Sequence, residues 1–412
     1  MLKINRIVIV SVLVFVQLAL YAQNNTNSPA TRYGYGELAD RSFGAGRAMG
    51  GIGYGLRSSK QINPLNPASY TSIDSMSFIF DVGASGQVSW FTDGVGNQRN
   101  VNGNIEYIAM LFPVHKRVAV SLGILPYSYV GYNYGMSEKT GSSTYVNSFI
   151  GTGGLNDLYG GLSIELWKKR LSVGANFGYL FGTIEHAKYL AFTNNAYSGT
   201  EVQSVEVRDL KMDFGIQYTH PLSHTESFTV GVAYTPSNKL NATSYMYETL
   251  QTSVLETDTI RNQAFDLPNS FGAGISYTKQ NKLTLAADVL YEDWSNARFF
   301  DSKDEFKNRV RVAAGTEYIP NFQHRSLIKR MRYRAGFHYS NSYLKIKDSS
   351  YNEYGASVGF GIPLLDNRSM VNISFEYVKV KPDSRPLLDE QYFRFTLNYT
   401  FNERWFFKFK VD

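Results

Sequence analysis

Near its end the chain reads YFRFTLNYTF over residues 392–401. From Phe393 onward an aromatic or aliphatic residue stands at every second position, and the polar residues from Arg394 to Thr400 stand between them. Successive side chains of a β-strand point to opposite faces. This stretch therefore predicts a strand with one apolar face and one polar face.

The same alternation recurs along most of the chain, with two kinds of polar connection between the runs. Further clear runs lie at residues 171–181, 228–234, 332–339, 355–362 and 371–377. Short turns are expected at residues 114–117, 167–170, 220–226, 280–281, 321–328 and 366–368, and longer loops at residues 92–103, 135–154, 193–200, 250–262, 301–307, 347–352 and 383–390. The two kinds alternate strictly, as in an up-and-down barrel with turns at one end and loops at the other. Six turns and seven loops join fourteen strands.

The length of the runs favours a membrane barrel over a soluble sandwich. Soluble strands are typically about 5–6 residues long, whereas a tilted strand needs about 9–11 residues to cross a bilayer, and most runs here are at least that long. Aromatic residues gather at the ends of the runs, as at Trp90, Trp167 and Trp405, where membrane barrels carry aromatic girdles. We expect an all-β, fourteen-stranded antiparallel transmembrane β-barrel over residues 76–402, surrounded by outer-membrane lipid in a Gram-negative cell.

The composition excludes several other classes of protein. Charged residues make up 18% of the chain, below the ~25% of soluble domains, and aromatic residues make up 15%, too many for a disordered protein. With no cysteine, the chain has no disulfides, no cysteine-ligated zinc and no lipoprotein anchor on an N-terminal cysteine. The net charge of +6 is mild for this length, and no nucleic-acid partner is expected.

The two ends of the chain read differently from the barrel. Residues 1–22 are predicted to be a secretory signal, with Lys3 and Arg6 before an apolar run at residues 7–16 and a cleavage point after Ala22. A single membrane helix is the alternative, but the run is short and a polar stretch follows it. Residues 403–412 are basic and aromatic and either extend the last strand or lie at the periplasmic interface.

Residues 23–75 have weak periodicity and are rich in Gly, Ser, Asn and Ala, so they cannot build a core of their own. The simplest place for such a segment is the barrel lumen, where it would act as a hatch or plug packed through small residues. A disordered periplasmic leader is the alternative.

Two stretches of this segment carry a family resemblance. Residues 43–51 (FGAGRAMGG) followed by residues 63–70 (NPLNPASY) resemble the N-terminal hatch of FadL-like outer-membrane proteins, which include TodX-type hydrocarbon transporters. The ending FNERWF at residues 401–406 looks like that of family members in Bacteroidota. The resemblance implies a gating role for Asn66, Pro67 and Ala68. The alternative is a plain turn into the first strand, because a residue before proline disfavours helix.

Pro126 is the sharpest local feature of the third strand, where it follows the apolar alternation of residues 118–124. Proline cannot donate to a β-ladder and is confined to edges, strand starts and bulges, so a local break in pairing is expected. The family resemblance implies an inward kink at Gly123 and Pro126 that opens a lateral gap in the wall. Alternatively, the membrane span ends near Leu125 and Pro126 begins an extracellular extension.

The positions expected to face the lumen carry charges of both signs. The predicted set is Asp288, Arg311, Glu317, Arg334, Glu376 and Arg394. Such a set indicates an ion-pair lattice that braces strands and hatch, since a solute-selective channel more often shows one sign of charge. A plugged barrel is therefore expected rather than an open porin.

No sequence pattern indicates catalysis or metal binding. His220 and His224 share one turn with Pro221 between them, so they lack the helical spacing of a metal pair. There is no nucleophile elbow, P-loop or zinc-protease motif. We predict no enzyme, no catalytic or metal-binding residue and no cofactor.

The resemblance implies an outer-membrane transporter for hydrophobic, fatty-acid-like small molecules, by passive diffusion and lateral exit from the barrel. The alternative is an accessory barrel subunit of an outer-membrane protein assembly or secretion complex, because some FadL-like barrels of Bacteroidota serve as protein partners. In that case residues 135–154 and the C-terminal tail could contact partner proteins. A continuous apolar tunnel would favour transport of a hydrophobic ligand, and a sealed lumen with an exposed apolar outer surface would favour the subunit.

Overall fold

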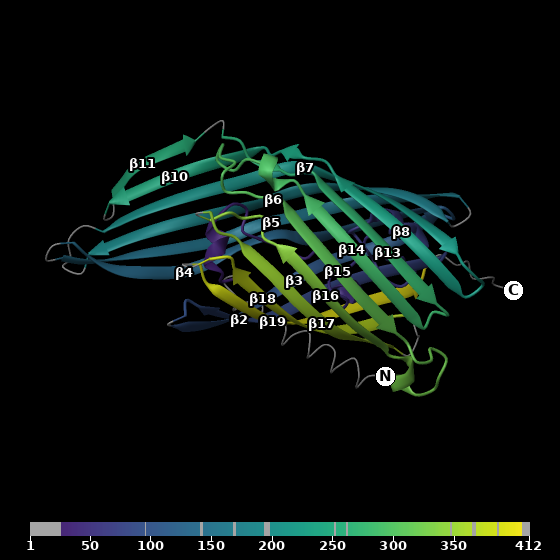
Figure 1. The fold of residues 1–412 in the computed structure, drawn as a ribbon. Coiled ribbons are helices and arrows are strands. Elements are labelled where there is room, and N and C mark those ends of the chain that lie inside the picture. The colour runs from purple at the N-terminus through teal and green to yellow at the C-terminus, as the bar shows by residue number, and fades with distance from the viewer. Residues whose placement is uncertain are drawn as a thin grey trace.

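The computed structural model shows a closed antiparallel β-barrel of fourteen strands, as predicted (Figure 1). It describes residues 26–94, 96–140, 143–167, 170–192, 198–250, 253–260, 263–346, 348–364, 368–384 and 387–405. The predicted signal and residues 406–412 of the predicted tail lie outside this part of the chain. Within it, none of the helices has the length and apolar character needed to cross a membrane.

The wall follows the chain order, each strand pairing with the next. Its strands are β2 (Ser77–Thr92), β3 (Asn97–His115), β4 (Val118–Thr140), β5 (Ser143–Trp167), β6 (Leu171–Phe192), β7 (Gly199–Pro221), β8 (Glu226–Thr235), β13 (Ser270–Lys279), β14 (Leu283–Glu292), β15 (Arg309–Tyr318), β16 (Arg332–Asn341), β17 (Tyr351–Pro363), β18 (Met370–Pro382) and β19 (Asp389–Arg404). The ladder between β19 and β2 closes the barrel, from Asp389–Thr92 to Arg404–Ser77.

The faces of the strands are reversed relative to a soluble protein. In β19, Thr396 and Asn398 are buried, whereas Phe393 and Tyr399 are 42% and 37% exposed. Polar residues thus face the interior and apolar residues face outward, the arrangement of a barrel that has lipid as its outer solvent.

The strands differ strongly in length around the barrel. β4 to β7 have 22 to 25 residues, whereas β13 to β16 have 10 each. Figure 1 shows the long strands projecting beyond the others at the long-loop end, where the hairpin of β10 (Ala242–Leu250) and β11 (Ser253–Ile260) continues the sheet along β7. We call this projecting sheet the wing; it consists of the projecting parts of β4 to β7 together with β10 and β11.

The predicted loops at residues 135–154 and 250–262 are therefore wrong in large part. β4 continues to Thr140 and β5 starts at Ser143, and β11 occupies much of the second stretch. The first predicted loop, residues 92–103, is also too long, because β3 starts at Asn97. These stretches lack the strict apolar–polar alternation of the other strands, so the sequence indicated loops.

The wall is interrupted between β3 and β4. Their ladder runs only from His115–Val118 to Ile108–Ile124. Beyond it, the edge of β4 pairs with the two-residue strand β1 (Glu37–Leu38) at Ser128 and Tyr129. The pairing of β4 with β5 also shifts register between Pro126 and Ser128.

The segment before β2 lies inside the barrel and is called the hatch here (residues 26–76) (Figure 1). Its short elements are η1 (Pro29–Arg32), β1, α2 (Gly44–Arg47) and η2 (Pro67–Ser72). Its contact with the wall depends on glycine on both sides. Gly50 adopts φ +78°, and a Cβ on Gly336 of β16 would lie 2.1 Å from the Met49 carbonyl carbon, so neither position accepts a side chain.

Candidate functional site

The hatch motif Asn66-Pro67-Ala68 starts η2 and ties it to the wall. Asn66 is fully buried; its Oδ1 accepts from the Ala68 N–H at 3.2 Å, which caps the helix. Its Nδ2 donates to the carbonyls of Tyr54 at 2.9 Å and of Ile216 on β7 at 3.3 Å. The motif is thus a cap and an anchor, and a gating role for these residues is a proposal.

Two of the predicted lumen residues hold the hatch backbone. The Asp288 carboxylate accepts from the N–H groups of Gly53 and Tyr54 at 2.5 and 2.8 Å. The Arg311 guanidinium donates to the Gly50 carbonyl at 3.0 Å and to the Asp40 carboxylate of the hatch at 3.3 Å.

The other four predicted lumen residues pair with one another in two separate places. Arg334 contacts Glu317 at 2.7 Å, and Glu317 also accepts from Arg332 at 2.8 Å. Arg394 lies 3.2 Å from Glu376 and 3.6 Å from Glu37 of β1. The six residues therefore lie at three places in the lumen, and an ion-pair lattice that joins them stays a prediction.

A fourth cluster involves residues that sequence reasoning did not select. Arg41 of the hatch contacts Asp157 at 3.2 Å and Asp213 at 3.1 Å, and the Lys211 ammonium lies 2.6 Å from Asp213. Arg47 of the hatch pairs with Glu106 at 2.9 Å. The signal in the sequence that could have identified this cluster is a pair of charged residues two positions apart in a strand. Residues 211 and 213 are such a pair, and both face the lumen.

The pKa values of two carboxyl groups of the hatch shift in opposite directions in this environment. Burial would raise the pKa of Asp40, but the guanidinium groups of Arg311 and Arg47 and hydrogen bonds from Ser42 outweigh it and hold that pKa well below its usual range. For Glu37, burial prevails over Arg394 and the Thr26 hydroxyl, and its pKa is raised. Asp40 is thus a firmly ionised anchor of the hatch.

A cavity of about 230 Å³ remains among these clusters. Its lining is rich in ionisable side chains from both hatch and wall, including Glu37, Asp40, Arg41, Arg47, Glu106, Lys211, Arg309 and Glu353. Apolar and aromatic groups such as Leu38, Tyr127 and Leu290 line it as well, so the cavity offers both charged and apolar surface.

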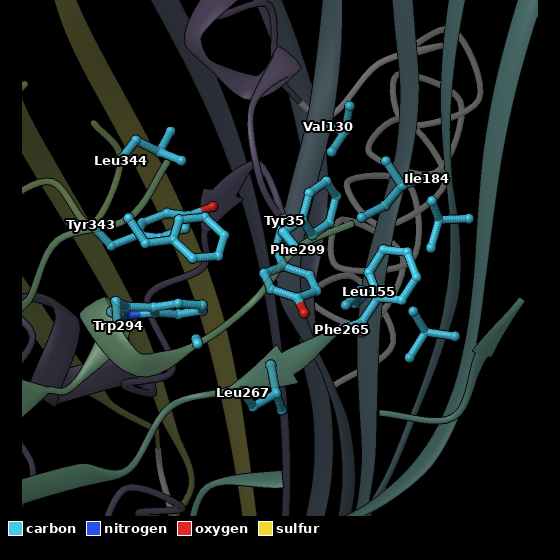
Figure 2. Close-up of a cluster of buried hydrophobic side chains, with 14 of the residues drawn as sticks. Tyr35, Val130, Leu155, Ile184, Phe265, Leu267, Trp294, Phe299, Tyr343 and Leu344 are labelled. Atoms are coloured by element: carbon cyan, nitrogen blue, oxygen red, sulfur yellow. The ribbon is translucent and has the colours of Figure 1, made fainter. Parts of the chain in front are cut away.

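A packed apolar cluster, which we call the cap, lies at the long-loop end of the barrel (Figure 2). Trp294 is fully buried, with its ring centre 4.5 Å from that of Tyr343 and 5.4 Å from that of Phe306. These loop residues pack onto Tyr35 of the hatch and onto wall residues such as Leu155 and Ile184. The hydroxyl of Tyr343 donates to the Gly36 carbonyl at 2.6 Å, which fastens loop to hatch.

The start of the hatch spans the interruption between β3 and β4; residues 26–38 are called the bridge. The Asn27 amide donates to Asn102 of β3 at 2.7 Å. The Thr31 hydroxyl contacts the backbone of Gly131 on β4 at 3.2 Å, and the β1 pairing follows. The bridge therefore contacts both strands where they no longer pair with each other.

The two predicted kink residues lie on β4 beside this interruption. A Cβ on Gly123 would approach Ala109 and Tyr159 within 2.8 Å, so the strands pack closely there. Pro126 stands two residues beyond the last β3–β4 pair and at the register shift with β5. That these residues form a functional kink is a proposal.

A fourteen-stranded barrel with an N-terminal hatch in its lumen has the architecture of FadL-like outer-membrane channels. One similar solved structure is a Pseudomonas aeruginosa FadL homologue, with 15% identity, a TM-score of 0.59, and coverage of 90% of this chain and 99% of that one. A second is the P. putida toluene transporter TodX, with 14% identity, a TM-score of 0.59, and coverage of 89% of this chain and 100% of that one. A third is the CymD monoaromatic hydrocarbon channel, with 15% identity, a TM-score of 0.57, and coverage of 88% of this chain and 98% of that one. At such identity the likeness shows the fold alone.

The chain belongs to the BamG family, whose model matches residues 1–412. A comparison with curated proteins finds no match. The resemblance of residues 401–406 to chains from Bacteroidota stays a prediction.

Proposed function

We propose that this chain is an accessory barrel subunit of an outer-membrane protein assembly or secretion complex in a Gram-negative cell. The observation that carries the proposal is the packing of the lumen. The cap packs at the long-loop end, charged clusters bind the hatch to the wall, and the bridge spans the interrupted wall. The long-loop end is then extracellular and the short-turn end periplasmic.

The cost of opening supports the same conclusion. Displacing the hatch would separate Arg41 and Arg311 from their carboxylates and leave buried charges unpaired. Each such loss typically costs about 3–5 kcal/mol. Passive diffusion of a hydrophobic molecule supplies no matching energy, whereas a structural subunit has no need to open.

The wing gives such a subunit a surface outside the bilayer. Its long strands β4 to β7 have 22 to 25 residues, about twice the about 9–11 residues that cross a membrane. Met136, Tyr189 and Tyr247 of the wing are 55%, 41% and 38% exposed. Exposed apolar groups on a projecting sheet favour contact with another protein.

Transport of a hydrophobic ligand with lateral exit is the second candidate, and the wall interruption favours it. Beyond Ile108 and Ile124, the bridge takes the place of a β3–β4 ladder. If the bridge moved, the lumen would open sideways towards lipid beside Pro126.

Locking the bridge distinguishes the two functions. The chain has no cysteine, so an Asn27→Cys and Asn102→Cys pair places the only two thiols where the two side chains touch at 2.7 Å. For an accessory subunit, the oxidised lock leaves the levels of other outer-membrane barrels and of co-purifying complex proteins unchanged. It also leaves uptake of a labelled hydrophobic compound at the level of cells without the protein. Uptake that the lock abolishes and a reductant restores, with each single-cysteine variant as control, would establish transport instead.

A further inference from the structure

The short-turn end of the barrel carries a strong excess of positive charge. Exposed basic residues of this end are Lys116, Arg117, Lys279, Lys282, Arg325, Lys329 and Arg404. Among the described residues, its exposed acidic groups are Asp74 and Glu403, and half-buried Glu226 is paired with Lys279 at 3.1 Å. This end therefore attracts anionic groups.

A second cavity, of about 330 Å³, lies at this basic end between the hatch and the inner wall of β13 to β16. Hatch residues Arg57 and Lys60 line one side, and Arg332 lines the other. Its only acidic lining residue is Glu317, which is already paired with Arg332 and Arg334. Apolar contacts come from Met49, Ile52, Ile319 and Phe322. The cavity thus combines positive charge with apolar surface.

Arg57 brings a positive charge to this cavity, and no carboxylate in the described part of the chain forms an ion pair with it. Its guanidinium donates to the hydroxyls of Ser172 and Thr71 at 3.0–3.1 Å. Burial lowers its pKa, which the more distant Glu165 only partly offsets. A carboxylate would be a better partner than a hydroxyl, because it can accept two parallel bonds from a guanidinium.

The turn between β15 and β16, residues 319–331, forms one rim of the cavity. The Ile319 N–H donates to the Lys282 carbonyl at 2.7 Å, which joins this turn to the β14 end, and the Asn321 N–H donates to the Lys329 carbonyl at 2.8 Å. Phe322, Leu327 and Ile328 are nevertheless 47%, 43% and 66% exposed. An ordered turn that exposes apolar groups beside Arg325 and Lys329 has the character of a protein contact surface.

We propose that this basic vestibule, the cavity with Arg57, Lys60, Lys282, Arg325 and Lys329, binds an acidic chain segment of a periplasmic partner protein. The proposal deepens the subunit role proposed above and rests on it for the existence of a partner. The cavity opens inside the rim of the barrel, against inward-facing residues such as Ser276 and Glu317. Lipid headgroups surround the outside of the rim, so a peptide with carboxylates and an apolar side chain fits this position better.

Binding of a synthetic peptide tests the vestibule directly. The full chain is placed in nanodiscs of zwitterionic phosphatidylcholine, and a fluorescein-labelled peptide of six Glu with one Leu and one Phe is titrated by anisotropy. K282E/R325E/K329E is expected to weaken binding at least tenfold. The matched triple K116E/R117E/R404E, also at the short-turn end, is expected to change it less than twofold.

Several outcomes would overturn the proposal. Equal weakening by both triples would mean that only the general field of the basic end attracts the peptide. Displacement of the peptide when phosphatidylglycerol replaces part of the phosphatidylcholine would assign the site to lipid. Migration of unheated samples in gels checks that both variants remain folded barrels.

A co-purification experiment separates this proposal from the subunit role. If partner proteins co-purify with the native chain and equally with K282E/R325E/K329E, the vestibule proposal is wrong and the subunit role stands. If the native chain binds the peptide but no partner protein co-purifies from its host, the subunit role fails, and the vestibule stands only as a site that binds acidic peptides.

Discussion

The lumen is packed by opposite chemistries at two levels. The cap at the long-loop mouth is a packed apolar core of Trp294, Tyr343 and their neighbours, resembling the interior of a soluble domain. Below it, the hatch is held by ion pairs such as Arg41–Asp157 and Glu37–Arg394. An apolar core tolerates local repacking, because its energy depends mainly on buried area. A buried ion pair does not tolerate such changes, because the loss of one partner leaves the other charge buried and unpaired.

This difference predicts a large effect at the ion pairs. Arg394→Met should lower the free energy of unfolding by about 3–5 kcal/mol, because Glu376 and Glu37 lose a buried cation. Urea denaturation of the barrel in detergent measures it. Arg208→Met is the matched control, since Arg208 forms an exposed pair with Glu206 worth about 0–1 kcal/mol. Equal effects of the two substitutions would show that the lumen pairs do not hold the hatch.

A truncation in the cap should have a smaller and more local effect. Leu344 is a buried loop residue of the cap, and Leu344→Ala should cost about 2–3 kcal/mol from lost burial and an incompletely filled cavity. Urea denaturation gives this cost. Hydrogen exchange should rise in the loops of the cap and not in hatch residues 40–57, which the charged clusters hold. Leu222→Ala, at an exposed position of a short turn, is the control with no expected change. If exchange rose equally in residues 40–57, cap and hatch would open together, contrary to the comparison.

The sequence predicted the barrel well because a membrane strand must alternate strictly. The turns near residues 114–117, 167–170 and 280–281 separate strands at those places in the structure. The wing was mistaken for loops because strict alternation is missing between residues 135 and 154. Strand count depended only on the number of connections, so the error in loop length left it unchanged.

The site was less predictable because it depends on contacts between distant segments. Alternation showed that Glu317 and Arg334 face the lumen, and they are cross-strand neighbours in the register of β15 and β16. It could not show that Asp157 and Lys211 meet Arg41, since the path of the hatch through the barrel is not periodic. The cap was missed for the same reason: its loop residues are dispersed over residues 265–351 and become a core only when the loops fold inward.

The smallest expected effect concerns the acid response of the hatch. The pKa of Asp40 is depressed in the folded state, so its ionised form contributes stability above the ordinary aspartate pKa of about 3.9. That contribution is lost as the pH falls further through the folded pKa. Unfolding midpoints measured from pH 7 to pH 2 should therefore fall more steeply below about pH 4 in the native chain than in Asp40→Asn. Asp348→Asn serves as control, because Asp348 is 89% exposed in its pair with Lys345 and should leave the curve nearly unchanged. Parallel curves for the native chain and Asp40→Asn would mean that Arg311 does not anchor the hatch through this carboxylate, and the comparison would then rest on the other ion pairs between hatch and wall.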